Sequence, residues 1–200
     1  MRAGRPLLAG LALAAAVLPQ PAVPASAESP SFDCAAADGE IEELICYDST
    51  LAGLDRDLAD VYRRAIESLP PDDAKQQNSI QLGWIKGRNE CWKAADPAAC
   101  TTYMYQARMV ELQIISGQLA VPEPVGYDCE DDQGPFFVVF YSDTNPPAVV
   151  LTRASDQVVA FRASSASGAR YVAANVEFWE HHGEATVAWF GKKFVCTVRQ

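Results

Sequence analysis

Three residue types that can carry acyl-transfer chemistry occur close together near the C-terminus of the chain. They are Ser167, His181 and Glu184. A serine, an imidazole and a carboxylate are the components of a nucleophilic triad, but a triad is recognised by its geometry rather than by its inventory. No G-x-S-x-G sequence surrounds Ser167, so the turn that exposes the serine of a hydrolase is not predicted. We therefore expect a protein that is not an enzyme.

The same region is suited to binding a protein surface. Ser165–Gly168 contains only Ser, Ala and Gly, which predicts a thin polar loop. Serine hydroxyls donate hydrogen bonds to carboxylates. Arg170 adds a cation, and Tyr171 adds a rigid side chain with a polar tip. Such a loop can enter a narrow groove, although a plain surface turn has the same composition.

The two histidines of the chain, His181 and His182, are adjacent. Neighbouring residues of a β-strand point to opposite faces of the sheet, so we expect the two imidazoles to face apart. This arrangement does not favour joint binding of one ion, and the sequence contains no C-x-x-C pair. We therefore expect no metal and no other cofactor.

The N-terminus has the pattern of a secretory signal peptide. Arg2 and Arg5 precede a short apolar run, and Ala25–Ala27 provides a cleavage site. The run is shorter than the roughly 20 apolar residues that a membrane-spanning helix needs. We expect cleavage near Ala27, a periplasmic or secreted protein, and no stable insertion into a membrane.

The chain is acidic, which limits its partners. Its formal charge is −10, and loss of Arg2 and Arg5 with the leader takes the charge from −10 to −12. Repulsion argues against nucleic acid and anionic lipid as partners, whereas a basic protein would associate faster in this field. The same acidity also suits an exported protein that simply has to stay soluble.

The periodicity of apolar residues changes near Val121–Pro124. Before this point apolar residues recur every three or four positions, which predicts helices over 40–46, 49–68, 73–92 and 98–117. After it, short β-prone runs alternate with turns, which predicts an antiparallel barrel or sandwich. The expected strands are 136–141, 148–152, 157–162, 170–172, 176–179, 185–189 and 193–198.

The sequence thus predicts an α+β protein built as two separate domains. A small disulfide-stapled helical bundle comes first, and an antiparallel β-barrel of about eight strands follows. The expected division is 1–27 for the signal peptide, 28–118 for the helical domain, 119–126 for a linker and 127–200 for the barrel.

The C-terminal region resembles the MliC/PliC family of inhibitors of C-type lysozyme. The resemblance rests on Tyr127–Cys129, on Ser167–Tyr171, which matches the S-G-x-x-Y loop of that family, and on His181–Ala185. It implies an eight-stranded barrel that inserts a loop serine and a hairpin residue into the cleft of its partner, C-type lysozyme. The contact residues that it implies are Ser165, Ser167, Gly168, Arg170, Tyr171, His181 and Glu184.

One position departs from the usual pattern of that family. His181 stands where a lysine is common. Histidine is only partly charged near neutrality, whereas lysine is fully charged. For Glu184 two roles stay open, because the carboxylate suits either contact with lysozyme or a bond to the backbone of its own hairpin.

The N-terminal region resembles the LprI-type helical module, which some exported proteins place before an MliC-like domain. The matching segments are Phe32–Ala35, Glu43–Cys46, Leu51–Asp55, and Trp84 with Arg88 and Cys91. We expect Trp84 and Leu54 to fill the core of this module, because a small domain has little interior.

Six cysteines follow the leader, and an even number in an exported chain predicts disulfides. Cys129 and Cys196 lie near the ends of the expected barrel and would link them. The other four allow three pairings. Cys91 and Cys100 flank a turn, which favours their pairing and leaves Cys34 with Cys46, although continuous helix between partners would separate them too far.

A second function of a different class stays open at this point. An envelope module that binds another protein or a glycan, without inhibiting lysozyme, has the same general features. A one-to-one complex with active lysozyme separates the two hypotheses.

Overall fold

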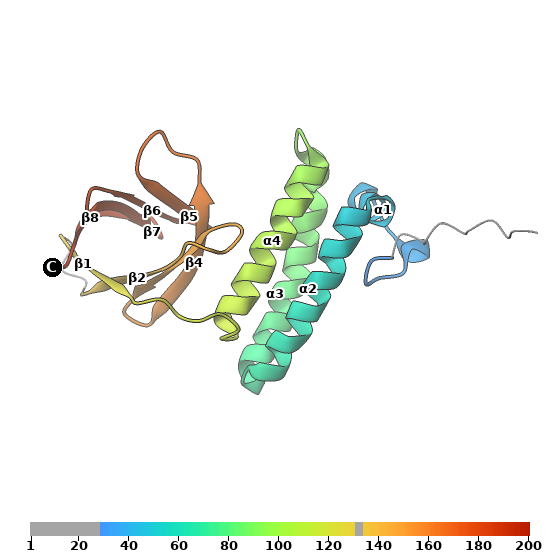
Figure 1. Cartoon of the computed structure of the whole chain (residues 1–200), viewed down its shortest axis with the longest axis horizontal. Helices are drawn as coiled ribbons and strands as arrows, with labels where there is room; N and C mark the ends of the chain where they lie inside the picture. The colour runs from blue at the N-terminus through green and yellow to red at the C-terminus, as the bar shows by residue number, and fades with distance from the viewer. Residues whose placement is uncertain (1–28, 131–133) are drawn as a thin grey trace, which may run out of the picture.

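The computed structural model describes residues 29–130 and 134–200, in which a helical region is followed by a β-barrel (Figure 1). The barrel is antiparallel and closed. The predicted α+β class, with a helical bundle before an antiparallel barrel, is confirmed. The expected signal peptide, residues 1–27, lies outside the described residues.

The helical region follows the predicted periodicity closely. Asp48 accepts hydrogen bonds from the backbone of Thr50 and Leu51 and so caps a long helix. Pro71 begins the next helix, in the first turn, where its missing N–H costs nothing. The elements are η1 (Cys34–Ala36), α1 (Glu40–Tyr47), α2 (Ser49–Ser68), α3 (Pro71–Asn89), η2 (Glu90–Lys93) and α4 (Pro97–Ile115).

Two disulfides reinforce the small core of this region. They join Cys34 to Cys46 and Cys91 to Cys100, with Cα–Cα distances of 5.9 and 5.6 Å. These are the pairs that the sequence favoured. The separation problem does not arise, because each disulfide joins a 3₁₀ helix to a neighbouring α-helix across a non-helical segment.

The barrel is an eight-stranded meander in which each strand pairs with its neighbours in the chain and β1 pairs with β8. Interior positions alternate with exterior ones, and aromatic rings such as Phe136, Phe178 and Trp189 fill the centre. The strands are β1 (Val125–Cys129), β2 (Phe136–Tyr141), β3 (Ala148–Arg153), β4 (Asp156–Ala163), β5 (Ala169–Ala173), β6 (Val176–His181), β7 (Glu184–Trp189) and β8 (Lys192–Val198).

Helix α4 packs against the outside of the barrel. Val110 of α4 is buried together with Tyr141, Ala148 and Val150 of β2 and β3, and Ile114 adds to this contact. Apolar side chains in the C-terminal half of α4 therefore cover part of the outer face of the barrel. We propose that the helical bundle and the barrel are separate domains whose boundary falls in the segment between α4 and β1.

Removal of the barrel disulfide is expected to destabilise the protein by about 4 kcal/mol. Cys129 and Cys196 are direct register partners on β1 and β8, and their bond closes a loop with a sequence separation of 67. In the chain-entropy model a loop of this length gives roughly that value, and the shorter Cys34–Cys46 loop gives about 3 kcal/mol. Urea unfolding of the two Cys→Ala double variants measures both losses. A larger loss from the shorter loop would contradict this prediction.

Candidate functional site

The meander brings the candidate loop and the candidate hairpin to the same end of the barrel. In an antiparallel meander, successive connections between strands alternate between the two ends of the barrel. The β4–β5 loop (164–168) and the β6–β7 turn are two connections apart, so they lie at the same end. Strand β5 also pairs with β6, and Ala169 lies opposite Glu180. The loop residues and His181 thus meet because of strand pairing, although they are far apart in the sequence.

The β4–β5 loop is fixed to β6 by a close backbone approach at Gly168. This glycine has a φ of +69°, a conformation that favours glycine. A Cβ atom at this position would lie 2.3 Å from the backbone oxygen of Glu180 and 3.1 Å from Cδ2 of His181. The loop therefore packs directly on the end of β6, and only glycine leaves room for this contact.

Two hydrogen bonds set the shape of the loop. The indole Nε1 of Trp179 donates to the backbone oxygen of Ser167 over 2.9 Å, and the Ser165 hydroxyl donates to the oxygen of Gly168 over 3.2 Å. Trp179 is 39% exposed, so it forms the floor of the loop rather than part of the core. The Ser167 side chain is exposed, and its hydroxyl bonds to no other described residue. This hydroxyl is available to a partner.

The β6–β7 hairpin ends in a tight turn with a positive φ at both central residues. His182 has a φ of +55° and Gly183 a φ of +82°, which matches the right-handed twist of the flanking strands. Glu180 accepts a hydrogen bond from the backbone N–H of Gly183 over 2.8 Å. His181 and Glu184 face each other across the hairpin, and both are exposed.

The expectation that the two imidazoles face apart is wrong. Their ring centroids lie 4.0 Å apart, because His182 belongs to the turn and not to the alternating strand. Within 29–130 and 134–200 no group of three or more His, Cys, Asp or Glu side chains could hold a metal ion.

Tyr171 and Arg170, which the family resemblance implies as lysozyme contacts, already contact other residues of the barrel. Tyr171 is 3% exposed and belongs to the barrel core, where its ring packs against Phe140. Direct contact between this side chain and a partner therefore has no support, and Tyr171 anchors the strand that follows the loop. Arg170 lies on the outer face, where its Nη2 donates to Glu177 over 2.6 Å. A partner would have to compete with this ion pair.

Glu180 was not among the residues that the sequence predicted for the site. It makes the hydrogen bond to the hairpin backbone that was one of the two roles considered for Glu184. Its carboxylate holds the turn, while the end of β6 supports Gly168. Glu180 is half-buried. Burial raises the pKa of Tyr127 to about 12, and the charge of Glu180 adds to this effect. The alternation of β6 could have identified Glu180 as an inward residue, since it is two positions from the buried Phe178.

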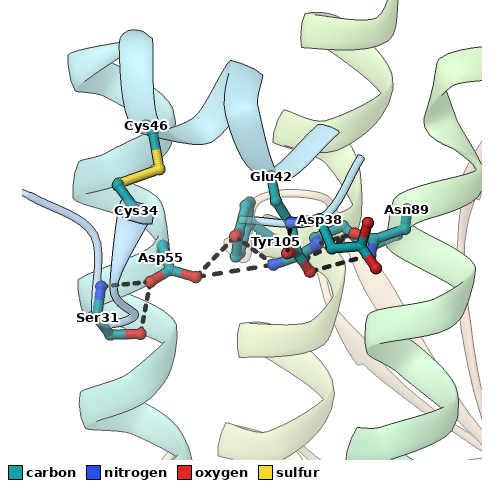
Figure 2. Close-up of polar contacts among 9 residues, drawn as sticks. Ser31, Cys34, Asp38, Glu42, Cys46, Asp55, Asn89 and Tyr105 are labelled. Carbon is teal, nitrogen blue, oxygen red and sulfur yellow. Dashed lines mark hydrogen bonds and ion pairs between the residues drawn. A yellow bond between two sulfur atoms is a disulfide. The ribbon is translucent and has the colours of Figure 1, made fainter. Parts of the chain in front are cut away.

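A polar cluster lies among the helices of the N-terminal region (Figure 2). Asp55 accepts hydrogen bonds from the Tyr105 hydroxyl over 2.8 Å and from the backbone N–H of Ser31 over 2.6 Å. Arg88 donates to Tyr105 over 2.9 Å and to Glu42 over 3.3 Å. The hydrogen bonds of this cluster therefore connect the N-terminal segment with α1, α2, α3 and α4.

Comparison with known proteins gives a match in each of the two regions. Residues 127–195 match the family MliC, described as membrane-bound lysozyme-inhibitor of c-type lysozyme. The barrel is therefore similar to the domains of this family. No solved structure matches the chain.

The relatives extend the match to the helical region. Lipoprotein LprI of Mycobacterium bovis and Lipoprotein LprI of Mycobacterium tuberculosis are each 34% identical to the chain over 177 residues. The matched region makes up 86% of this chain and 88% of each relative. The chain belongs to the LprI family, and both resemblances drawn from the sequence are confirmed.

Proposed function

We propose that this chain is an exported inhibitor of C-type lysozyme that acts by non-covalent occlusion, without catalysis and without a cofactor. The match of the barrel to the MliC family supports this role. The name of the LprI relatives, lipoprotein, supports a location in the cell envelope or outside the cell. No helix in the described part of the chain is long and apolar enough to cross a membrane.

The proposed contact joins the β4–β5 loop to the catalytic groove of lysozyme. Lysozyme cleaves glycosidic bonds with two carboxyl groups that flank the bond. The Ser167 hydroxyl donates a hydrogen bond to one of these carboxyl groups, and the thin loop displaces the sugar. His181 and Glu184 of the adjacent hairpin contact the rim of the groove. An acidic protein also associates readily with a basic enzyme.

The observation that carries the proposal is the combination of a free hydroxyl with a fixed backbone. Trp179 and Gly168 hold the loop in one conformation, while the Ser167 hydroxyl has no bond to the rest of the described chain. A loop that is already ordered loses little conformational entropy on binding. This is the property that a competitive protein inhibitor needs.

The first test is inhibition of hen egg-white lysozyme on cell walls by oxidised residues 28–200. Ser167→Ala is expected to weaken inhibition at least tenfold, about 1.4 kcal/mol, because it removes the hydroxyl that reaches the carboxyl group. Ser155→Ala is the matched control. Ser155 is an exposed serine in the β3–β4 turn, at the opposite end of the barrel, so its removal should leave inhibition unchanged.

Each result has a distinct meaning. If wild type inhibits and Ser167→Ala inhibits equally well, the function stands and the assignment of the loop fails. If the verified, oxidised protein neither inhibits nor binds lysozyme, the inhibitor proposal fails, and binding of another envelope protein or a glycan replaces it.

A further inference from the structure

A mostly apolar slot lies at one end of the helical domain. It has a volume of about 330 Å³, and Ile41 and Leu44 of α1, Trp92 of η2, and Pro97 of α4 provide its apolar walls. Trp92 is 51% exposed, an unusual position for a large aromatic side chain. The polar network centred on Asp55 does not involve these residues, and the proposed contact of the barrel loop does not use them.

The walls of the slot are held rigidly. Cys91, directly before Trp92, is bonded to Cys100 of α4. Lys93 lies over the Trp92 ring, 5.3 Å from its centroid, and forms an ion pair with Glu90. A tryptophan that is already positioned loses little entropy when a partner covers it, and rigid exposed tryptophans are frequent energetic centres of protein interfaces.

The charge around the slot selects the type of partner. Glu40 and Asp96 line it, and Glu43 is a further acidic residue in the first turn of α1. Lys93 is the basic residue closest to Trp92 along the chain, and Glu90 neutralises it. An apolar side chain flanked by lysine or arginine fits this combination, whereas an acidic protein or an anionic lipid surface is repelled.

The position of the slot points to a particular partner. In Figure 1 the α3–α4 connection and the β4–β5 loop project toward the same side of the molecule, at the top of the view. We propose that the slot receives an apolar side chain with neighbouring basic groups on the surface of the same lysozyme whose cleft the loop blocks. This inference rests on the proposed function and adds a second contact to it.

Two contacts on one chain slow dissociation, because a partner that releases one of them is still held by the other. The test measures association and dissociation rates of hen egg-white lysozyme on immobilised, oxidised residues 28–200. Trp92→Ala is expected to raise the dissociation rate at least fivefold and to leave the unfolding temperature unchanged. Tyr103→Ala, which removes an aromatic side chain that is 43% exposed and outside the slot, should change neither rate.

A second variant tests the charge of the slot separately. Glu40→Lys places a cation at the exposed rim and is expected to slow association at least threefold at low ionic strength. This difference should shrink as salt screens the rim. Glu40 also lies in the first turn of α1, where an acidic side chain stabilises the helix, so the unfolding temperature of this variant must equal that of wild type at the same low ionic strength.

The outcomes separate this inference from the proposed function. If Ser167→Ala weakens binding while Trp92→Ala and Glu40→Lys bind like wild type, the second contact does not exist and the inhibitor proposal stands. If wild type shows no binding to lysozyme, both proposals fail. If Trp92→Ala dissociates faster and Glu40→Lys associates more slowly with the expected response to salt, the slot is part of the interface.

Discussion

Replacement of Gly168 by valine is expected to weaken lysozyme inhibition at least a hundredfold, about 2.8 kcal/mol, while the barrel stays folded. The new Cβ would lie 2.3 Å from the backbone oxygen of Glu180, which has no room to withdraw within the β5–β6 pairing. The positive φ of Gly168 is also unfavourable for a β-branched residue. The loop must therefore leave β6, and Ser167 leaves with it.

The measurement is the inhibition constant, with circular dichroism as a check on folding. Gly191→Val is the matched control, because Gly191 has a φ of +88° but nothing within 4 Å of its added Cβ. It lies between β7 and β8, at the end of the barrel away from the loop. This variant carries the same backbone strain and should inhibit like wild type. Equal losses in the two variants would show that strain, and not displacement of the loop, causes the effect.

Most of the secondary structure was predictable, because helix-forming residues dominate before Val121 and β-prone runs separated by turn residues dominate after Pro124. The spacing of Leu51, Leu58 and Val61 fixed the buried face of α2, and these side chains lie in the helical core. The continuous run of aromatic and β-branched residues over 136–141 predicted β2 with its observed bounds. Helix α3 ends earlier than expected, because the chain turns into η2 just before the disulfide at Cys91.

The sequence indicated that the 164–168 segment is a loop, but it did not indicate the contacts of the candidate site. The small residues of 164–168 indicated a loop, and family resemblance placed Ser167 and His181 together. The bond from Trp179 to Ser167 depends on strand register, which a single sequence does not specify well. Tyr171 illustrates the same limit, because an amphipathic side chain suits both a binding surface and a core.

Contacts between distant elements were the hardest to predict. The packing of Val110 and Ile114 against the barrel was not expected, because an apolar stripe on a helix does not reveal which neighbour it covers. The buried pair of Asp55 and Arg88 was missed for a similar reason. Both residues occur in the segments that suggested the LprI-type module, but each looks like an ordinary surface charge until the helices are packed.

That pair gives the second large effect, because Asp55→Asn is expected to destabilise the helical domain by about 3 kcal/mol. Asp55 is 7% exposed and Arg88 is 4% exposed, so the substitution leaves a buried guanidinium with less compensating charge. Burial raises the pKa of Tyr105, which keeps its hydroxyl protonated and donating to Asp55. A hydrogen bond from the backbone N–H of Asp38 lowers the pKa of Glu42, which favours its charged form. Arg88 is paired with both Glu42 and Asp55, so Glu42 alone does not compensate its charge.

Urea unfolding of residues 28–200, followed by circular dichroism at helical wavelengths, measures this loss. Asp57→Asn is the control, since Asp57 is an exposed carboxylate on the same helix and should change stability by less than about 0.5 kcal/mol. A comparable small change for Asp55→Asn would mean that water or local rearrangement compensates the buried charge. The β4–β5 loop that is proposed to bind lysozyme belongs to the barrel, so the Asp55→Asn protein should still inhibit lysozyme through Ser167 in the absence of urea. Retained inhibition would distinguish a loss of stability from a loss of the binding surface.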